Sequence, residues 1–238
     1  MAPHTEQLTR PAVQLRGLTR SFEGRTVLDG IDLDLPAGQF TALLGHSGSG
    51  KSTLLRAIAG LDHKVAGSGR LTAPEKVSVV FQDSRLLPWR RVLDNVLLGL
   101  DGKDAEQKGR EALAEVGLAG RERAWPSELS GGEAQRAALA RSLVREPELL
   151  LADEPFGALD ALTRIKMHAL LRELWRRHQP SVLLVTHDVD EAIVLAERVL
   201  VLDAGGVALD LAIERGAAAR GEYREQLLAA LGVTEGVG

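Results

Sequence analysis

The sequence predicts an α/β fold, in which a parallel sheet is combined with an antiparallel β subdomain and an inserted α-helical subdomain. Short, almost continuously apolar runs recur along the chain, as expected of strands that helices cover on both faces. These runs alternate with helical patterns, which implies parallel strands joined by right-handed crossovers. Residues 83–146 contain no comparable strand pattern, so we interpret them as a helical lobe inserted into the sheet.

The strands are predicted from two kinds of apolar pattern. Residues 13–15 and 31–35 alternate apolar and polar side chains, which is the period of half-buried antiparallel strands. Residues 40–44 are almost wholly apolar, which indicates a strand buried on both faces. The same kind of run recurs at residues 77–81, 149–152 and 182–185. We therefore predict an antiparallel pair and four strands of a parallel sheet.

The helices are predicted from apolar residues that recur with a helical period. The i, i+3, i+4, i+7 stripe of a helix packed on a sheet is formed by Met167, Leu170, Leu171 and Leu174. Helical patterns also cover residues 109–116 and 133–144 of the lobe, and residues 222–231 near the end. Residues 199–207 predict a hairpin that closes the sheet.

Length and composition bound the organisation of the chain. Its 238 residues suffice for one large domain, which we place at residues 13–207. The predicted core comprises about residues 13–82 and 147–207, the helical subdomain about residues 83–146, and a C-terminal tail residues 208–238. The absence of cysteine excludes disulfides and fits a reducing compartment. The net charge of −4, with basic residues scattered among acidic ones, disfavours nucleic acid as a partner.

A glycine-rich loop between an apolar strand and a helical pattern carries the clearest chemistry. Residues 45–53 match the pattern G-x-x-x-x-G-K-[ST] in the context that this pattern requires. The glycines let backbone N–H groups point at a polyphosphate, and the helix start adds partial positive charge. Lys51 is predicted to reach the β- and γ-phosphates, and the Ser52 hydroxyl to bind Mg²⁺. The alternative is a flexible turn, which the flanking strand and helix disfavour.

Polar residues follow three of the predicted strands. Ligands bind at the carboxyl ends of parallel strands, where Gln82, Asp153 and His187 are expected to meet. Asp153 is positioned to hold Mg²⁺ through water, and Glu154 to orient or deprotonate the attacking water. Gln82 is predicted to bind the metal and the water, and His187 the γ-phosphate. A lone Gln or His at a strand end is common without function, so the prediction depends on their joint occurrence.

A second glycine-rich helix start lies at Ser130-Gly131-Gly132. Ser130 is a good N-cap, and the two glycines leave N–H groups free at the positive end of the helix. The chain has one P-loop, so this start has no nucleotide of its own. It could bind the ATP of another copy in a head-to-tail dimer; the alternative is a capped helix without a ligand.

In the order in which they occur along the chain, from about residue 13 to residue 207, these motifs resemble those of the nucleotide-binding subunits of ATP-binding cassette (ABC) transporters. The resemblance implies a P-loop NTPase (RecA-like) core, with Glu154 as catalytic base and His187 as switch histidine. Phe22 matches the aromatic residue that stacks on adenine, although the family more often has Tyr there and a plain core Phe is the alternative. Residue 133 is Glu in a signature that more commonly has Gln.

The resemblance implies ATP and Mg²⁺ as cofactors. The residues expected to bind nucleotide are Phe22, Gly45, Ser47, Gly48, Ser49, Gly50, Lys51, Ser52, Thr53, Ser130, Gly131, Gly132 and Asp160. The expected metal ligands are Ser52, Gln82 and Asp153, and the expected catalytic residues are Glu154, His187 and Gln82.

A narrower resemblance lies in residues 81–89 and 92–96, which are similar to importers of aliphatic sulfonates, taurine and nitrate, most closely the aliphatic sulfonate ones. It implies a homodimeric ATPase on the cytoplasmic face of the (inner) cell membrane. Its partners would be an integral membrane permease dimer and, indirectly, a periplasmic solute-binding protein. Leu86, Leu87 and Trp89 could seat a short helix of that permease, or be buried within the lobe. Taurine or nitrate import, and a non-transport ATP-dependent regulator, are the alternative functions.

Overall fold

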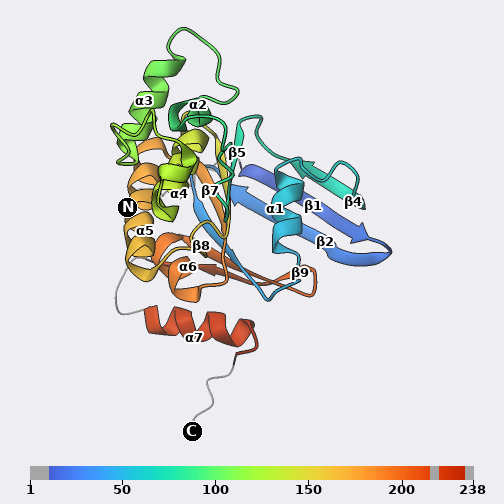
Figure 1. Ribbon diagram of the computed structural model, residues 1–238. Coiled ribbons are helices and arrows are strands. Elements are labelled where there is room, and N and C mark those ends of the chain that lie inside the picture. Colours follow the sequence, from blue (N-terminus) through green and yellow to red (C-terminus); the bar gives the residue numbers. More distant parts are fainter. Residues whose placement is uncertain (1–10, 215–219, 234–238) are drawn as a thin grey trace, which may run out of the picture.

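The computed structural model describes residues 11–214 and 220–233, which form two sheets and the helices that cover them (Figure 1). The larger sheet has the strand order β5-β6-β7-β3-β8-β9. All its pairings are parallel except that of β8 with β9. Its strands are β3 (Phe40–Leu44), β5 (Val77–Phe81), β6 (Leu149–Asp153), β7 (Ser181–Val185), β8 (Arg198–Asp203) and β9 (Gly206–Ala212). Because β3 lies between β7 and β8, the loop that follows β3 leaves the middle of the sheet.

The smaller sheet is antiparallel, with the order β2-β1-β4. It consists of β1 (Pro11–Phe22), β2 (Arg25–Pro36) and β4 (Ala66–Thr72). The two strands predicted from alternation pair with each other, with Val13 opposite Leu35 and Leu15 opposite Leu33. The sequence analysis missed β4, because its side chains are almost all exposed and show no apolar alternation.

The helices of the lobe are α2 (Val92–Val96), α3 (Ala105–Glu115), the 3₁₀ turn η1 (Pro126–Glu128) and α4 (Gly131–Leu143). The remaining helices are α1 (Lys51–Ile58), α5 (Ala161–His178), α6 (Val189–Leu195) and α7 (Arg220–Ala230). We did not predict α6, which spans only seven residues, too few to show a helical period. The closing hairpin runs to Ala212 rather than to residue 207. Parts of the predicted tail, residues 215–219 and 234–238, lie outside the described residues.

Two apolar cores cover the two faces of the larger sheet. In β7 every residue is buried: Val182 and Leu184 belong to the core beneath α4, α5 and α6, and Leu183 and Val185 to the core shared with α1, β1 and β2. Figure 1 shows α1 and the antiparallel sheet on one side of the larger sheet and α4, α5 and α6 on the other. This two-sided burial explains the continuous apolar runs. No helix within residues 11–214 and 220–233 is long and apolar enough to cross a membrane.

The loop between β5 and α2 is held by one buried side chain, Asn95. Its Oδ1 accepts a hydrogen bond from the backbone N–H of Leu87 (2.6 Å). Its Nδ2 donates to the carbonyl oxygens of Leu87 (3.1 Å), Arg90 (3.0 Å) and Arg91 (3.1 Å). Asn95 is fully buried, and it therefore gives the loop that carries the exposed Trp89 a defined shape.

We expect Asn95→Ala to lower the free energy of unfolding by about 2 kcal/mol, because the loop loses its hydrogen-bond partner in a buried setting. Chemical denaturation of the variant and the wild type measures the difference. Asp94→Ala changes an exposed neighbour on the same helix and should stay within about 0.5 kcal/mol of wild type. Equal stabilities of Asn95→Ala and wild type would show that the loop does not depend on this side chain.

Candidate active site

The loop after β3 closes around the side chain of Lys51. Lys51 is the first residue of α1, and its Nζ donates to the carbonyl oxygens of Gly45 (2.7 Å) and His46 (2.8 Å). Gly50 has φ +105°, and a Cβ there would lie 2.7 Å from Leu28 Cδ2. A side chain at residue 50 is therefore excluded both by backbone conformation and by the strand beneath the loop.

Lys51 is buried, and two carboxylates are near enough to act on its ammonium group electrostatically. Burial lowers the pKa of Lys51, while the charges of Glu154 and Asp153 oppose this shift. An anionic ligand at the same place would favour the charged form in the same way as these carboxylates do. The loop therefore offers a phosphate group a cation that is already positioned and only partly hydrated.

Ser52 and Asp153 join the start of α1 to the end of β6. Ser52 Oγ donates to Asp153 Oδ1 at 3.2 Å. Burial raises the pKa of Asp153, and the bond from Ser52 opposes this shift. Oxygen ligands of this kind suit Mg²⁺. The described residues contain no group of three or more His, Asp or Glu that could hold a metal by itself, so an ion here would need phosphate oxygens or water as further ligands.

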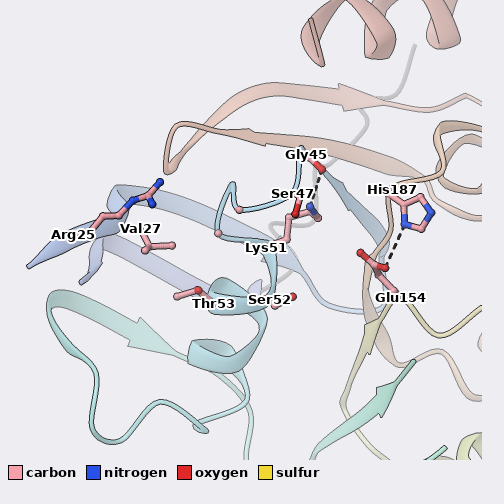
Figure 2. Close-up of a pocket in the computed structure, with 11 residues that line it drawn as sticks. Arg25, Val27, Gly45, Ser47, Lys51, Ser52, Thr53, Glu154 and His187 are labelled. Carbon is pink, nitrogen blue, oxygen red and sulfur yellow. Dashed lines mark hydrogen bonds and ion pairs between the residues drawn. The ribbon is translucent and has the colours of Figure 1, made fainter. Parts of the chain in front are cut away.

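Glu154 and His187 meet across the ends of β6 and β7. His187 Nδ1 lies 3.3 Å from Glu154 Oε2. The backbone N–H of Glu154 donates to the carbonyl oxygen of Val185 (2.9 Å), and Glu154 has φ +46°. This left-handed conformation is unfavourable for a non-glycine residue, so the surrounding structure must hold it in place. In Figure 2 the Glu154 carboxylate lies on the side of the loop that carries Lys51, and the His187 ring lies beyond it, joined to it by the dashed contact.

These groups, apart from Asp153, share one cavity of about 530 Å³. Its lining residues are Arg25, Val27, Gly45, Ser47, Gly48, Gly50, Lys51, Ser52, Thr53, Glu154 and His187. Figure 2 shows Arg25 and His187 at opposite ends of the cavity, with Lys51 between them. Ser49 instead lines an adjoining cavity of about 280 Å³ beside the turn between β8 and β9. Most of the residues predicted around the phosphate loop are thus brought together.

Two residues that line the cavity were missed from the sequence. Arg25 and Val27 come from β2, and Arg25 pairs with Phe22 across the β1–β2 hairpin. Phe22 itself does not line the cavity, although it is exposed beside it on the hairpin. Their position depends on how the hairpin packs against the loop, for which the sequence contains no local signal.

Gln82 is also absent from the cavity lining. It follows β5 and is exposed. A Cβ added to Gly157 would lie 3.3 Å from Gln82 Nε2, so the amide lies against the loop that follows Glu154. The preceding carbonyl oxygen, that of Phe81, accepts a hydrogen bond from Gln135 Nε2 of α4 (2.8 Å). The end of β5, directly before Gln82, is therefore hydrogen-bonded to α4, the helix that Ser130 caps.

The second glycine-rich start lies outside this cavity. Ser130 caps α4, and the Glu133 carboxylate accepts from the Ser130 backbone N–H (2.9 Å). A Cβ at Gly132 would lie 2.6 Å from Thr163 Cγ2 in the first turn of α5. Asp160 caps that helix by accepting from the Thr163 N–H (3.0 Å). The predicted residues Ser130, Gly131, Gly132 and Asp160 therefore gather at the adjoining starts of α4 and α5.

The fold and the cavity define a P-loop nucleotide-binding protein. Residues 28–157 match the family model described as ABC transporter. The chain is 83% identical to "Aliphatic sulfonates import ATP-binding protein SsuB 2" of Streptomyces avermitilis, over 99% of this chain and 96% of that protein. It is 66% identical to the protein of the same name from Mesorhizobium japonicum, over 98% of this chain and 97% of that one.

Solved structures show the same fold. The ATP-binding cassette MJ0796, in a dimeric post-hydrolysis state bound to ADP and Pi, superposes with a TM-score of 0.74 at 30% identity. The superposition covers 86% of this chain and all of that one. CbiO1 from Clostridium perfringens gives 0.78 at 26% identity, over 92% of this chain and 91% of that one. The chain belongs to the ABC transporter family, and the predicted fold class and family resemblance are confirmed.

Glu133 is the point at which the signature departs from its commoner form. Its carboxylate also accepts from the Arg121 guanidinium (2.8 and 3.1 Å). The Ser130 backbone N–H, together with Arg121 and the Ser130 hydroxyl, lowers the pKa of Glu133 to about 2 from an ordinary 4.5. The carboxylate thus remains charged and paired at the start of α4, where the helix dipole favours it.

We expect Glu133→Gln to lower the free energy of unfolding by about 1 kcal/mol at pH 7, because charge-assisted hydrogen bonds are replaced by neutral ones. The pKa of Glu133 is lower in the folded chain, so its contribution is present above pH 4.5 and is lost as the pH falls from 4.5 toward 2. Denaturation at pH 7 and pH 3 should show a gap between variant and wild type that narrows at pH 3. Glu225→Gln, at an exposed site, controls for net charge; an unchanged gap for Glu133→Gln would contradict the prediction.

Proposed function

We propose that this chain hydrolyses ATP to energise an ABC importer of aliphatic sulfonates. The observation that carries the proposal is the single cavity in which the phosphate loop faces Glu154 and His187. The family membership of the chain supports ATP as the ligand. The triphosphate lies in the loop, where backbone N–H groups and Lys51 neutralise its charge.

The residues at the strand ends supply the hydrolytic chemistry. Glu154 orients the attacking water and accepts its proton, and His187 contacts the γ-phosphate. The 3.3 Å contact between His187 and Glu154 keeps both side chains at the same end of the cavity. Ser52, Gln82 and Asp153 hold Mg²⁺ together with phosphate oxygens and water; the ion, when bound, neutralises charge that develops on the phosphates. Phe22 and Arg25 pair on the hairpin, and we propose that they contact the base.

Two copies complete each site. The start of α4 does not line the cavity of its own chain, and the related cassette MJ0796 is dimeric in two solved structures. In the proposed homodimer, Ser130, Gly131 and Gly132 of one copy bind the γ-phosphate held by the other, and Asp160 lies at the same interface. The exposed apolar side chains of Leu162 and Ile165 adjoin Asp160 and would be covered there. Hydrolysis then reopens the dimer.

The membrane partner is proposed to sit on the loop between β5 and α2. Trp89 is 70% exposed, while Leu86 and Leu87 are half-buried. This patch binds a short helix of a permease dimer. Gln82, at the start of the same loop, couples the position of that helix to the nucleotide. The chain then lies peripherally on the cytoplasmic face of the inner membrane, and a periplasmic solute-binding protein delivers the cargo to the permease. We propose that residues 13–207 form the ATP-binding domain and that residues 208–238 are a C-terminal tail.

The cargo is proposed from the relatives, because no nucleotide-binding residue touches it. The two relatives reported above are named for aliphatic sulfonate import, and each matches nearly the full length of this chain. Taurine or nitrate import uses the same ATPase chemistry and remains the alternative cargo. A non-transport regulator would need neither Glu154 nor His187.

We expect Glu154→Gln to lower ATP turnover at least about 100-fold, because the water loses its general base. ATP binding should persist, and the variant with ATP should stay dimeric, since hydrolysis no longer opens the dimer. A steady-state ATPase assay and the molar mass in solution measure both effects. Lys51→Ala should weaken ATP binding at least about tenfold, whereas Lys64→Ala, on an exposed loop, should not. Equal turnover by Glu154→Gln and wild type would remove Glu154 from the mechanism.

We expect a bacterial strain that lacks this chain to lose growth on an alkanesulfonate as sole sulfur source and to keep growth on sulfate. Wild-type protein should restore growth, and Glu154→Gln should not, because transport requires hydrolysis. Parallel cultures on taurine as sulfur source and on nitrate as nitrogen source distinguish the alternative cargoes. Loss of growth on taurine or nitrate alone would replace sulfonate as the cargo.

A further inference from the structure

A partly buried histidine, His168, lies behind the catalytic pair and has no part in the mechanism above. It is on α5, and its Nε2 donates a hydrogen bond to Glu191 Oε1 of α6 (2.6 Å). The side chain of Glu191 is only 5% exposed and that of His168 15%. A buried carboxylate requires a hydrogen-bond partner, because an unpaired one would be strongly destabilised.

The same imidazole ring packs against the segment that carries Glu154. The ring of Phe156 meets that of His168 edge-on, with centroids 5.2 Å apart and an interplanar angle of 64°. Phe156 is buried and lies two residues after Glu154. A shift of the ring of His168 would therefore be transmitted to the turn that holds Glu154 in its left-handed conformation.

Glu191, in turn, lies one helical turn from His187. Asp188 caps α6 by accepting from the Glu191 backbone N–H (3.1 Å), and it directly follows His187. Arg164, one turn before His168 on α5, lies 3.6 Å from Asp188. A small cavity between these groups is lined by Glu154, Phe156, Gly157, Arg164, Thr186, His187, Asp188 and Glu191. The α5 face that bears His168 thus supports both segments of the catalytic pair.

We propose that His168 is a positioning residue for ATP hydrolysis, which holds Glu154 and His187 at their mutual distance through Phe156 and Glu191. The inference rests on the proposed function, since it concerns the rate at which that site works. His168 itself is not among the residues that line the cavity. Its loss therefore alters the arrangement of the reacting groups rather than the binding of ATP, and small misplacements of such groups are costly to the rate.

The test compares variants that keep different contacts of His168. His168→Phe keeps an aromatic ring beside Phe156 but cannot bond Glu191, and its kcat should fall about tenfold or more with the KM for ATP within about twofold of wild type. His168→Gln retains an N–H donor for Glu191 and should restore kcat to within about threefold of wild type. Thermal unfolding confirms that each variant is folded at the assay temperature. Should His168→Phe not fold, His168→Asn, whose amide is too short to reach Glu191, replaces it.

His178 provides the matched control. It lies on the same helix and bonds a glutamate, Glu115 of α3, at 3.0 Å, but it is remote in sequence from both catalytic segments. His178→Phe should leave kcat unchanged. Folded His168→Phe with wild-type kcat, a parallel loss in His178→Phe, or a loss confined to KM would overturn the inference. The same assay tests the proposed function separately, through ATP turnover by the wild type that Glu154→Gln abolishes. The proposed function therefore stands even if the inference about His168 fails.

Discussion

The closure of the glycine-rich loop around the Lys51 ammonium is the interaction on which the rest of the site depends. The carbonyl oxygens of Gly45 and His46 accept hydrogen bonds from the ammonium, and Asp153 and Glu154 act on it electrostatically. The loop can take this shape because it leaves the middle of a sheet covered on both faces. A cation desolvated by burial is partly prepared for a polyphosphate before any ligand arrives.

The site is divided between rigid elements rather than built on one of them. The phosphate loop follows β3, Asp153 ends β6, and His187 follows β7. Because these strands pair in parallel, the loop, the carboxylate and the imidazole all lie at the same edge of the sheet. The helices behind the sheet then set the finer geometry. The bond from Ser52 to Asp153 joins α1 to β6, and the contacts of His168 join α5 to the segments of Glu154 and His187.

The glycine-rich start of α4, in contrast, lies outside the cavity of its own chain. Ser130 and Asp160 lie at adjoining helix starts and each accepts a capping hydrogen bond, yet neither lines the cavity of the same chain. Gln135 of α4 donates a hydrogen bond to the carbonyl oxygen of Phe81, the residue before Gln82. A movement of α4 would therefore displace the loop that bears Trp89. In the proposed dimer, α4 of one copy would therefore contact the nucleotide held by the other copy and connect it to the loop that binds its own membrane partner.

The sequence by itself determined the fold class, the buried strands and the phosphate loop, because each has a local signature: continuous apolar runs, helical periods and a fixed glycine spacing. It also indicated Glu154 and His187, because parallel strands must end at one edge. Only the tertiary structure decided that β4 joins the antiparallel sheet, that Arg25 rather than Phe22 lines the cavity, and that His168 bridges Phe156 and Glu191. These features depend on packing between segments far apart in the chain, and no local pattern of residues encodes them.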